Sequence, residues 1–289
     1  MIFITQVNLI AFAINNECVK DKSVEKWIDN RVDHKQLKNA RISFKDHVKD
    51  KTCLGYASAH NDTRTVRKLV EAGADVNATD TEGYTPLHEA CESKIEVKEK
   101  VKYLLGRDAS LIRARTNKGN TPLGRAAYNG HDKVIGILIQ HGAEVNERGW
   151  HGRTALHDAC SKGQVACIDE LMRHGADVEA TDSANKASPL QLAVDFNHPD
   201  SVKVLLDKYN ASINATNKSG ITALHRAVAK GNLEVVKLLT SYNQCDVNAK
   251  NNAGKTALDV ARDKGHKDVV HYLAHACMLI LRGDWVKNL

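Results

Sequence analysis

Four side chains between residues 157 and 174 are of the types that bind zinc. They are His157, Cys160, Cys167 and His174. Imidazoles and thiolates are the usual ligands of tetrahedral zinc sites, in which two cysteines commonly lie close together as Cys-x2-Cys. No such pair occurs here, and the four residues are divided between two predicted helices. We therefore predict no metal site at these residues.

Catalytic motifs are also missing from the sequence. The glycines occur singly and at a regular spacing, not in a phosphate-binding loop, and neither Ser nor Cys lies in a nucleophile motif. Arg282-Gly283-Asp284 resembles an integrin-binding tripeptide, but such a site would act outside the cell, where a thiol-rich protein is not expected. The sequence thus predicts no catalytic residue, no cofactor and no enzymatic activity.

Composition restricts the environments and partners of the chain. The 289 residues carry a net charge of +6 that is spread along the chain, which does not favour nucleic-acid binding. Seven cysteines without paired spacing favour reduced thiols and a cytoplasmic or nuclear location. Residues 1–14 are apolar but lack the basic start of a signal peptide, and no run of about 18 apolar residues is present, so we expect no membrane insertion.

A repeated phrase indicates the elements that must position any functional side chain. Gly83-Tyr84-Thr85-Pro86-Leu87-His88-Glu89-Ala90 returns in altered form at 121–126, 154–159, 188–193, 222–227 and 256–261. Aligned on the capping Thr or Ser, the intervals are 36, 33, 34, 34 and 34 residues. An earlier copy begins at Thr52, 33 residues before Thr85. A second phrase, Gly-Ala-Asp-Val-Asn or close to it, ends the second helical segment of several copies.

This period and the Thr-Pro-Leu-His-x-Ala core resemble the ankyrin-repeat family. The resemblance covers roughly residues 48–276 and implies an all-α ankyrin-repeat solenoid of about seven helix-turn-helix units with β-hairpin loops. Residues 1–47 are interpreted as an N-terminal helical cap, in the form of a degenerate repeat, or as a linker. Residues 277–289 form an apolar C-terminal tail that packs over the last repeat, contacts a partner or marks a truncated chain.

Each motif position has a physical role. The Thr is expected to cap the first helix and the Pro to occupy its first turn, while the resemblance implies that the His bonds a neighbouring backbone group or the Thr hydroxyl. Glycines of the hairpins are expected to have positive φ. Three extra residues after Ala90 predict a longer helix or turn in that repeat. Because Lys186 replaces a hairpin glycine, we expect the adjacent Asn185 to take the left-handed conformation.

The resemblance implies non-catalytic recognition of another protein or peptide segment on the concave face, by a monomeric scaffold or adaptor. Candidate contacts are the hairpin and first-helix residues that the repeat does not dictate. They are Tyr84, Glu89, Arg125, Tyr128, Asn129, Trp150, His151, Asp158, Lys162, Phe196, Lys218, Arg226 and Lys230. Trp150 is the first choice because Trp, Tyr and Arg dominate binding hot spots. With Tyr84, Tyr128, Arg125 and Arg226 it would line an aromatic and basic groove for an acidic or mixed peptide; the alternative is that it lies flat on its own hairpin.

Other interpretations stay open at this point. Asn77 and Asn146 are similar to residues hydroxylated by the asparaginyl hydroxylase that acts on ankyrin repeats, or they simply brace the hairpin. The chain is alternatively a regulatory or substrate-recruiting subunit of an enzyme complex of the ubiquitin, proteasome or phosphatase type. It is also interpreted as a fragment of a larger multidomain protein.

Overall fold

The computed structural model describes residues 41–44, 48–71 and 73–281. They belong to two compact units, and the boundary between the units crosses a single repeat. The N-terminal unit extends to Ala126 and also contains Lys133–Ala143, while the C-terminal unit contains Ala127–Asp132 and the chain from Glu144. Arg282-Gly283-Asp284, the rest of the chain after Leu281 and residues 1–40 lie outside the described residues, as do most of the predicted N-terminal cap and the end of the predicted tail.

Each repeat begins with a short first helix whose start is fixed by the repeated phrase. At α6 (Pro86–Glu92), the Thr85 hydroxyl accepts a hydrogen bond from the backbone N–H of His88, and the His88 ring accepts one from the backbone N–H of Thr85. These reciprocal bonds satisfy N–H groups that a helix N-terminus otherwise leaves without partners. The same capping box begins α10 (Ala155–Ser161), α12 (Pro189–Asp195), α14 (Ala223–Ala229) and α16 (Ala257–Lys264).

The N-terminal unit starts with a two-stranded antiparallel ribbon. Strand β1 (Arg41–Phe44) pairs with β2 (Val48–Thr52), with one irregularity between Ile42 and Phe44. The sequence analysis interpreted residues 1–47 as a helical cap or a linker, and strand β1 at 41–44 differs from both, because β-branched and aromatic residues such as Ile42 and Phe44 favour strand pairing. The helices that follow are α4 (Cys53–His60), α5 (Thr63–Glu71), α6 and α7 (Val97–Arg107), then the 3-10 turn η2 (Ala109–Arg113).

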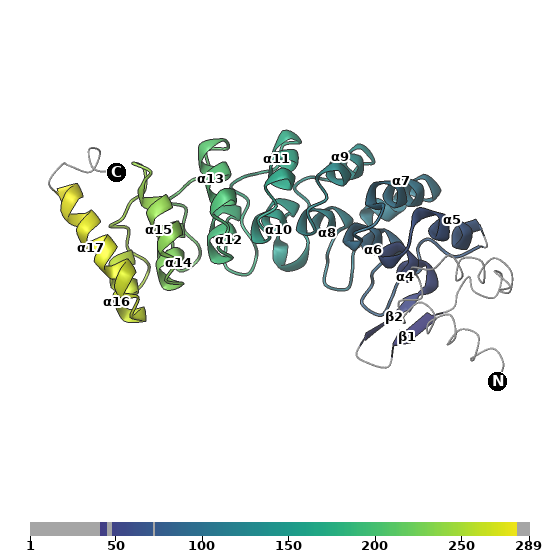
Figure 1. The fold of residues 1–289 in the computed structure, drawn as a ribbon, viewed down its shortest axis with the longest axis horizontal. Helices are drawn as coiled ribbons and strands as arrows, with labels where there is room; N and C mark the ends of the chain where they lie inside the picture. The colour runs from purple at the N-terminus through teal and green to yellow at the C-terminus, as the bar shows by residue number, and fades with distance from the viewer. Residues whose placement is uncertain (1–40, 45–47, 72, 282–289) are drawn as a thin grey trace. The chain divides into compact units, whose positions relative to one another are not determined.

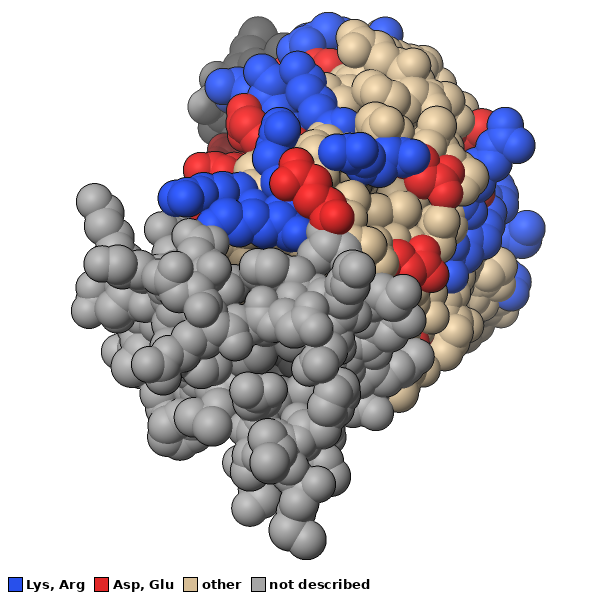
Figure 2. All heavy atoms as spheres, turned by 90° about the vertical axis from the view of Figure 1, so that its right-hand side faces the viewer, with Lys and Arg blue, Asp and Glu red and all other residues tan. Residues whose placement is uncertain are grey.

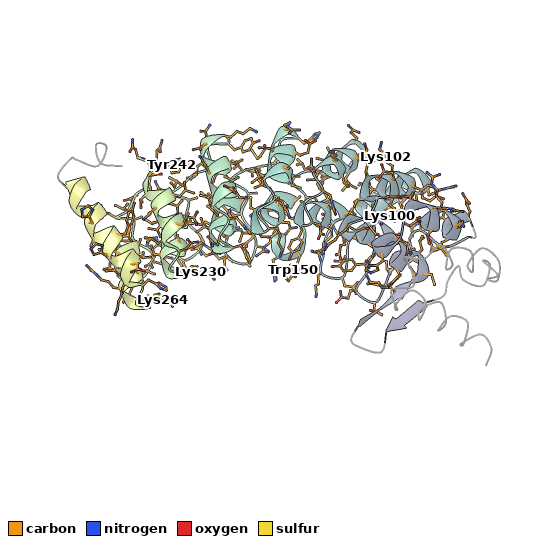
Figure 3. The ribbon with its side chains drawn as sticks, in the orientation of Figure 1. Lys100, Lys102, Trp150, Lys230, Tyr242 and Lys264 are labelled. Atoms are coloured by element: carbon orange, nitrogen blue, oxygen red, sulfur yellow. The ribbon has the colours of Figure 1, made fainter. Side chains whose placement is uncertain are left out.

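A buried lysine joins two repeats of the N-terminal unit. Lys100, on α7, has no exposed surface. Its Nζ donates to the carbonyl oxygens of Ser58 and Asn61, at 2.7 and 3.0 Å, and to the hydroxyl of Ser93, at 2.6 Å. Ser58 and Asn61 lie at the end of α4 and Ser93 caps α6, so one ammonium group holds the C-terminal ends of two first helices. Figure 3 labels Lys100 within the helices of this unit.

The C-terminal unit is a regular stack of helix pairs. The first helices α10, α12, α14 and α16 form one row, and each carries a second helix in the other row (Figure 1). The second helices are α11 (Val165–Arg173), α13 (Pro199–Asp207), α15 (Leu233–Thr240) and α17 (Lys267–Leu281). The boundary repeat consists of α8 (Pro122–Tyr128) and α9 (Asp132–Gln140). Helix α17 extends past 276, where the sequence analysis placed the end of the array.

The all-α prediction is confirmed, since the ribbon of β1 and β2 contains the only strands within the described ranges. The core consists of the leucines and alanines of the repeated phrase together with apolar side chains of the second helices, such as Ile168 and Leu171. Leu87 and Leu156 have no exposed surface, and Leu224 is 2% exposed. Alanines at the last position of the phrase, such as Ala159 and Ala227, are also fully buried. Small and branched side chains therefore alternate along the interior, as close helix packing requires.

Backbone hydrogen bonds connect successive hairpins of the C-terminal unit. Ser183 N donates to His151 O at 2.8 Å, Lys218 N to Asn185 O at 2.9 Å, and Asn252 N to Ser219 O at 3.0 Å. Each bond runs from the tip of one hairpin to the tip of the hairpin before it. The hairpins therefore form a continuous strip along the edge of the first helices.

The turns between first and second helices also fit into the next repeat. At Gly163, with φ of 69°, a Cβ atom would approach His198 Nδ1 of the following repeat to 2.6 Å, and at Gly231 one would approach His266 Nδ1 to the same distance. Asn197 occupies the equivalent left-handed position in the intervening repeat and is hydrogen bonded to Asn232. At Gly130 a Cβ atom would approach Gln164 Oε1 to 2.6 Å, so the junctions are of three kinds: glycine against a ring, glycine against glutamine and asparagine against asparagine.

Two departures from the repeat pattern have clear structural outcomes. The three extra residues after Ala90 lengthen both the turn and the second helix of that repeat. The turn 93–96 has four residues, whereas the turn 162–164 has three. Helix α7 has 11 residues, whereas α9, α11 and α13 have nine. The hairpin prediction was wrong, because Lys186 takes the positive φ, of 58°. The Asp182 carboxylate accepts from Asn185 N and Ala187 N, which fixes the loop with Lys186 at the left-handed position.

Candidate functional site

The repeat histidines are structural groups. In His88, His157 and His225 the ring Nδ1 lies 2.9 Å from the capping Thr hydroxyl. The Nε2 of each ring lies 3.0 to 3.1 Å from a backbone carbonyl of the next hairpin, on Asn120, Ala187 and Lys255 respectively. A carbonyl only accepts, so Nε2 carries the proton and Nδ1 accepts from the hydroxyl. Burial lowers the pKa of His88 and of His157 to about 4, so both rings are neutral near pH 7. This confirms the role that the resemblance implied.

The four residues of zinc-binding type have separate environments. His157 makes the two contacts described above, and His174 Nε2 lies 3.1 Å from Glu170 Oε1. Cys160 and Cys167 are buried free thiols, and burial raises the pKa of Cys167 to about 12. Over the described ranges no cluster of three His, Cys, Asp or Glu side chains has the arrangement of a metal site.

Trp150 is the most exposed aromatic candidate on a hairpin. It begins the 3-10 turn η3 (Trp150–Gly152), and 43% of its surface is exposed. Its ring lies 4.3 Å from the ring of His151, at an interplanar angle of 38°. The ring therefore contacts its own hairpin on one side and presents its other surface to solvent. Figure 3 shows Trp150 and Lys230 on the side of the first helices, with Tyr242 on the side of the second helices.

The basic candidate residues of the C-terminal unit differ in whether other groups of the chain already bind them. Arg226 forms an ion pair with Asp195 of the preceding first helix, and only 12% of its side chain is exposed. Lys218 donates to the carbonyls of Ser183 and Ala184, at 3.1 and 3.0 Å, and so braces the neighbouring hairpin. Lys230 is exposed.

The remaining candidates of this unit lie at the ends of the first helices or on α10. The ammonium of Lys162 lies 4.6 Å from the centre of the Tyr128 ring, a cation–π contact. Phe196 is 51% exposed, and Asn129 and Asp158 are half-buried. Phe196 is thus more exposed than Trp150, although the sequence analysis ranked Trp150 first.

The candidate binding residues of the N-terminal unit are mostly buried or held in ion pairs. Tyr84 is 9% exposed and Glu89 is 1% exposed, so the expectation that both lie on an accessible surface was wrong. Glu89 pairs with Lys51 at 2.7 Å, and Arg125 pairs with Glu92 at 2.5 Å. Seen from the right of Figure 1, Lys and Arg lie among Asp and Glu instead of gathering by sign (Figure 2). The aromatic and basic groove predicted from the sequence has its residues divided between the two units, and as a binding site it stays a prediction.

The two asparagines named for hydroxylation brace successive hairpins. Asn77 Nδ2 donates to Asp108 Oδ2 at 2.6 Å. Asn146 Nδ2 donates to Gly175 O at 3.1 Å, and its Oδ1 accepts from Asp177 N at 2.8 Å. Asn214 makes the same pair of contacts, and the sequence analysis missed it because no Gly-Ala-Asp precedes it. These bonds support the bracing role; hydroxylation stays a prediction.

A family model described as ankyrin repeats matches the chain in overlapping segments, at residues 9–112, 54–149, 96–182, 151–217 and 190–280. The chain belongs to the ankyrin-repeat family. The family resemblance inferred from the repeated phrase is therefore confirmed, and ankyrin repeats are protein-binding modules. Within the described residues of this ankyrin-repeat protein, no helix combines the length and the apolar composition needed to span a bilayer.

The curated relatives are longer proteins. Human palmitoyltransferase ZDHHC13 is 36% identical over 205 residues, which cover 70% of this chain and 32% of the relative. The bovine SMC5-SMC6 complex localization factor protein 1 is 36% identical over 107 residues, 36% of this chain and 10% of the relative. Human ankyrin repeat and SOCS box protein 3 is 33% identical over 100 residues, 33% of this chain and 19% of the relative. The ankyrin-repeat chain thus matches a third or less of the length of each.

Proposed function

We propose that this ankyrin-repeat protein is a non-catalytic scaffold or adaptor whose C-terminal unit binds a partner protein. The contact surface is the one formed by first helices and hairpins, which solenoid curvature makes concave in repeat proteins. The observation that carries the proposal is the exposure of two large aromatic side chains, Trp150 at 43% and Phe196 at 51%, in a unit that also carries exposed lysines. Aromatic anchors with a polar surround are typical of binding hot spots.

The N-terminal unit supports the same assignment by contrast. Its candidate side chains Glu89 and Arg125 are held in ion pairs, whereas Trp150 and Phe196 leave half of their surface or nearly half in solvent. A partner therefore gains more buried apolar area on the C-terminal unit. We propose that the protein acts in this way as a monomer, in the cytoplasm or the nucleus, with no nucleic-acid partner.

A Trp150→Ala variant tests the proposal. We expect it to weaken binding of the partner by at least about 1 kcal/mol, because a hot-spot ring is removed, and to leave the melting temperature nearly unchanged. Partners would be captured from cells with the wild-type chain, purified, and titrated calorimetrically against both proteins.

Ile95→Ala is the matched control, since Ile95 is a 47% exposed apolar residue of the N-terminal unit. It should leave binding unchanged. A Trp150→Ala protein that loses melting temperature while keeping its affinity would assign Trp150 to structure instead of binding.

A regulatory or substrate-recruiting role within an enzyme complex is the second candidate. It is favoured by relatives whose names are those of a palmitoyltransferase and of a SOCS box protein, with ankyrin segments matched to this chain. The same surface would then hold the recruited protein. Co-purification of an enzyme activity with the wild-type chain, lost in Trp150→Ala, would distinguish this role from a simple scaffold.

A further inference from the structure

One side-chain position recurs along the C-terminal unit at the end of every first helix. It is the residue immediately before the left-handed residue of each inter-helix turn, and we name these residues the C-cap row. The row consists of Asn129, Lys162, Phe196, Lys230 and Lys264. Successive members are 33 or 34 residues apart, so each repeat contributes one. The sequence analysis missed Lys264, although its spacing of 34 residues from Lys230 was available.

The C-cap row is cationic and has an apolar member in its middle. Lys162, Lys230 and Lys264 are exposed and form no ion pair within the part of the chain that the structure describes, and Phe196 is 51% exposed. The carboxylates next to the row already have partners. Asp195 is paired with Arg226, and Asp263 with Lys255 at 2.5 Å. The Lys162 ammonium also faces the Tyr128 ring at 4.6 Å and Lys230 acts electrostatically on Asp195, but none of the three lysines is held in an ion pair with a described side chain.

The spacing of the row matches an extended polypeptide. Neighbouring packed helices lie about 10 Å apart, and a polyproline II segment rises about 3.1 Å per residue with three residues per turn. One repeat therefore corresponds to about one turn, or three residues, of a ligand in this extended conformation, whose every third side chain points to the same side. Side chains at every third position of such a ligand would meet successive members of the row.

We propose that the C-cap row binds an extended acidic segment of the partner in a fixed register. Carboxylates at positions 1, 7 and 10 of the segment pair with Lys162, Lys230 and Lys264, and an apolar side chain at position 4 packs on Phe196. This inference rests on the proposed function and names the chemistry of the partner. Charge complementarity favours a peptide over a nucleic acid, because three lysines spread over three repeat intervals are sparse beside a clustered phosphate-binding patch.

Labelled 12-residue peptides test the register directly. One series has Glu at positions 1, 7 and 10 with Phe at 4, a second has the same order reversed to allow for chain direction, and the remaining positions are Gly or Ser. A permuted peptide of the same composition has its four key residues at every second position. Fluorescence anisotropy at physiological salt should show that one of the spaced peptides binds at least about fivefold tighter than the permuted one, since only it aligns all four contacts.

A double charge reversal, Lys162→Glu with Lys230→Glu, tests the row itself. It should weaken the spaced peptide at least about tenfold, while a control reversal on the second helices, Lys203→Glu with Lys267→Glu, should change affinity less than about twofold. The control replaces exposed lysines and gives the same net charge. Circular dichroism melting confirms that both variants fold, and a misfolded reversal is replaced by Lys162→Gln with Lys230→Gln.

Each contrary result overturns the inference. If the spaced and permuted peptides bind equally well, the ligand is not bound in a fixed register. If the two double charge reversals weaken binding equally, the peptide is attracted by net charge and not by the C-cap row. A single-stranded oligonucleotide that binds more tightly than the peptides, and is lost with Lys162→Glu and Lys230→Glu, would assign the row to nucleic acid. If no peptide binds while Trp150→Ala still releases a captured partner, the C-cap row fails and the proposed function stands; if that variant also has no effect, both fail.

Discussion

In both units an arginine four residues after the capping Thr pairs with a carboxylate of the preceding first helix, but the surroundings of the pair differ. Arg125 pairs with Glu92 in the N-terminal unit, and Arg226 with Asp195 in the C-terminal unit. Around the first pair the polar groups are internal, because Lys51 holds Glu89 and Lys100 is wholly buried. Around the second, Phe196 and Lys230 are exposed at the helix ends.

This difference shows that equivalent positions of the repeat can either stabilise the stack, as in the N-terminal unit, or lie exposed to solvent, as in the C-terminal unit. The N-terminal unit contains the irregular repeat, whose longer turn has no glycine equivalent to Gly130, Gly163 or Gly231, and the contacts of Lys100 join the end of its first helix to that of the preceding one. The C-terminal unit has junctions that recur at equivalent positions of successive repeats, so exposed side chains outside these contacts, such as Phe196 and Lys230, are not needed to hold the stack together. Exposed side chains that do not stabilise the fold are the ones from which a binding site can form.

The largest expected effect concerns the shared core. Leu156→Ala or Leu224→Ala in the C-terminal unit, and Leu87→Ala in the N-terminal unit, should each cost about 2–5 kcal/mol, because a buried leucine is replaced by a cavity. Hydrogen exchange should show the loss concentrated in the unit that carries the change, since repeats contact mainly their neighbours. Denaturation curves that match the wild type would contradict the repeat register, and uniform loss over both units would remove the distinction between them.

The second effect depends on pH. The folded-state pKa of His157 is about 4, below its ordinary value of 6.5, so the unfolded chain binds the extra proton first and stability falls as pH drops from 6.5 towards 4. The loss approaches about 1.4 kcal/mol per pH unit. Gln191 shows that an amide can replace the ring, since its Nε2 donates to the carbonyls of Ala215 and Ile221.

His157→Gln should therefore flatten the acid dependence of α10 and α12 in hydrogen exchange between pH 4.5 and 7. The N-terminal unit, which keeps His88, should remain as acid-sensitive as in the wild type. An unchanged pH profile around α10 in the variant would show that burial of His157 is not the cause.

The smallest expected effect belongs to Lys100. Burial lowers its pKa from 10.5 to about 8, so between these values the unfolded chain holds more protons and rising pH stabilises the folded wild type. Relative to Lys100→Met, the wild type should gain about 1–3 kcal/mol from pH 8 to 10.5. Urea denaturation at several pH values measures the difference.

Lys133→Met is the control for this prediction, because Lys133 is an exposed lysine of the N-terminal unit. Its stability difference from the wild type should stay constant over the same pH range. A constant difference for Lys100→Met as well would mean that the ammonium group is solvated in the folded protein.

Local chemistry made most of the fold predictable. The capping of Thr85 by His88, and the positive φ of hairpin glycines such as Gly83, depend on residues a few positions apart and recur in most copies. Glu89 and Lys100 were not predictable, because each is buried by groups about 40 residues away that no local pattern specifies. A lysine on a helix is normally exposed, and the three extra residues after Ala90 distinguish this repeat without indicating that Lys100 is buried.

The binding surface was predictable in part. Trp150 and Phe196 were found as departures from the repeat, and both are exposed. The sequence did not reveal that Arg226 is held by Asp195 or that Lys218 braces a hairpin, since both contacts cross from one repeat to the next. Comparing the same position in every copy, instead of looking for unusual residues, would have brought Lys264 into the candidate set.

The paired asparagines at one junction restrict how this gene could shorten by recombination. Loss of the 34-residue segment 222–255 would place Asn197 against the ring of His266. That ring packs against Gly231 in the intact chain, where a Cβ atom would be too close to it. Loss of 154–187 would instead set Gly130 against His198, repeating the arrangement already present at Gly163. Descendants of this chain that have lost one copy should therefore more often have lost the earlier segment than the later one.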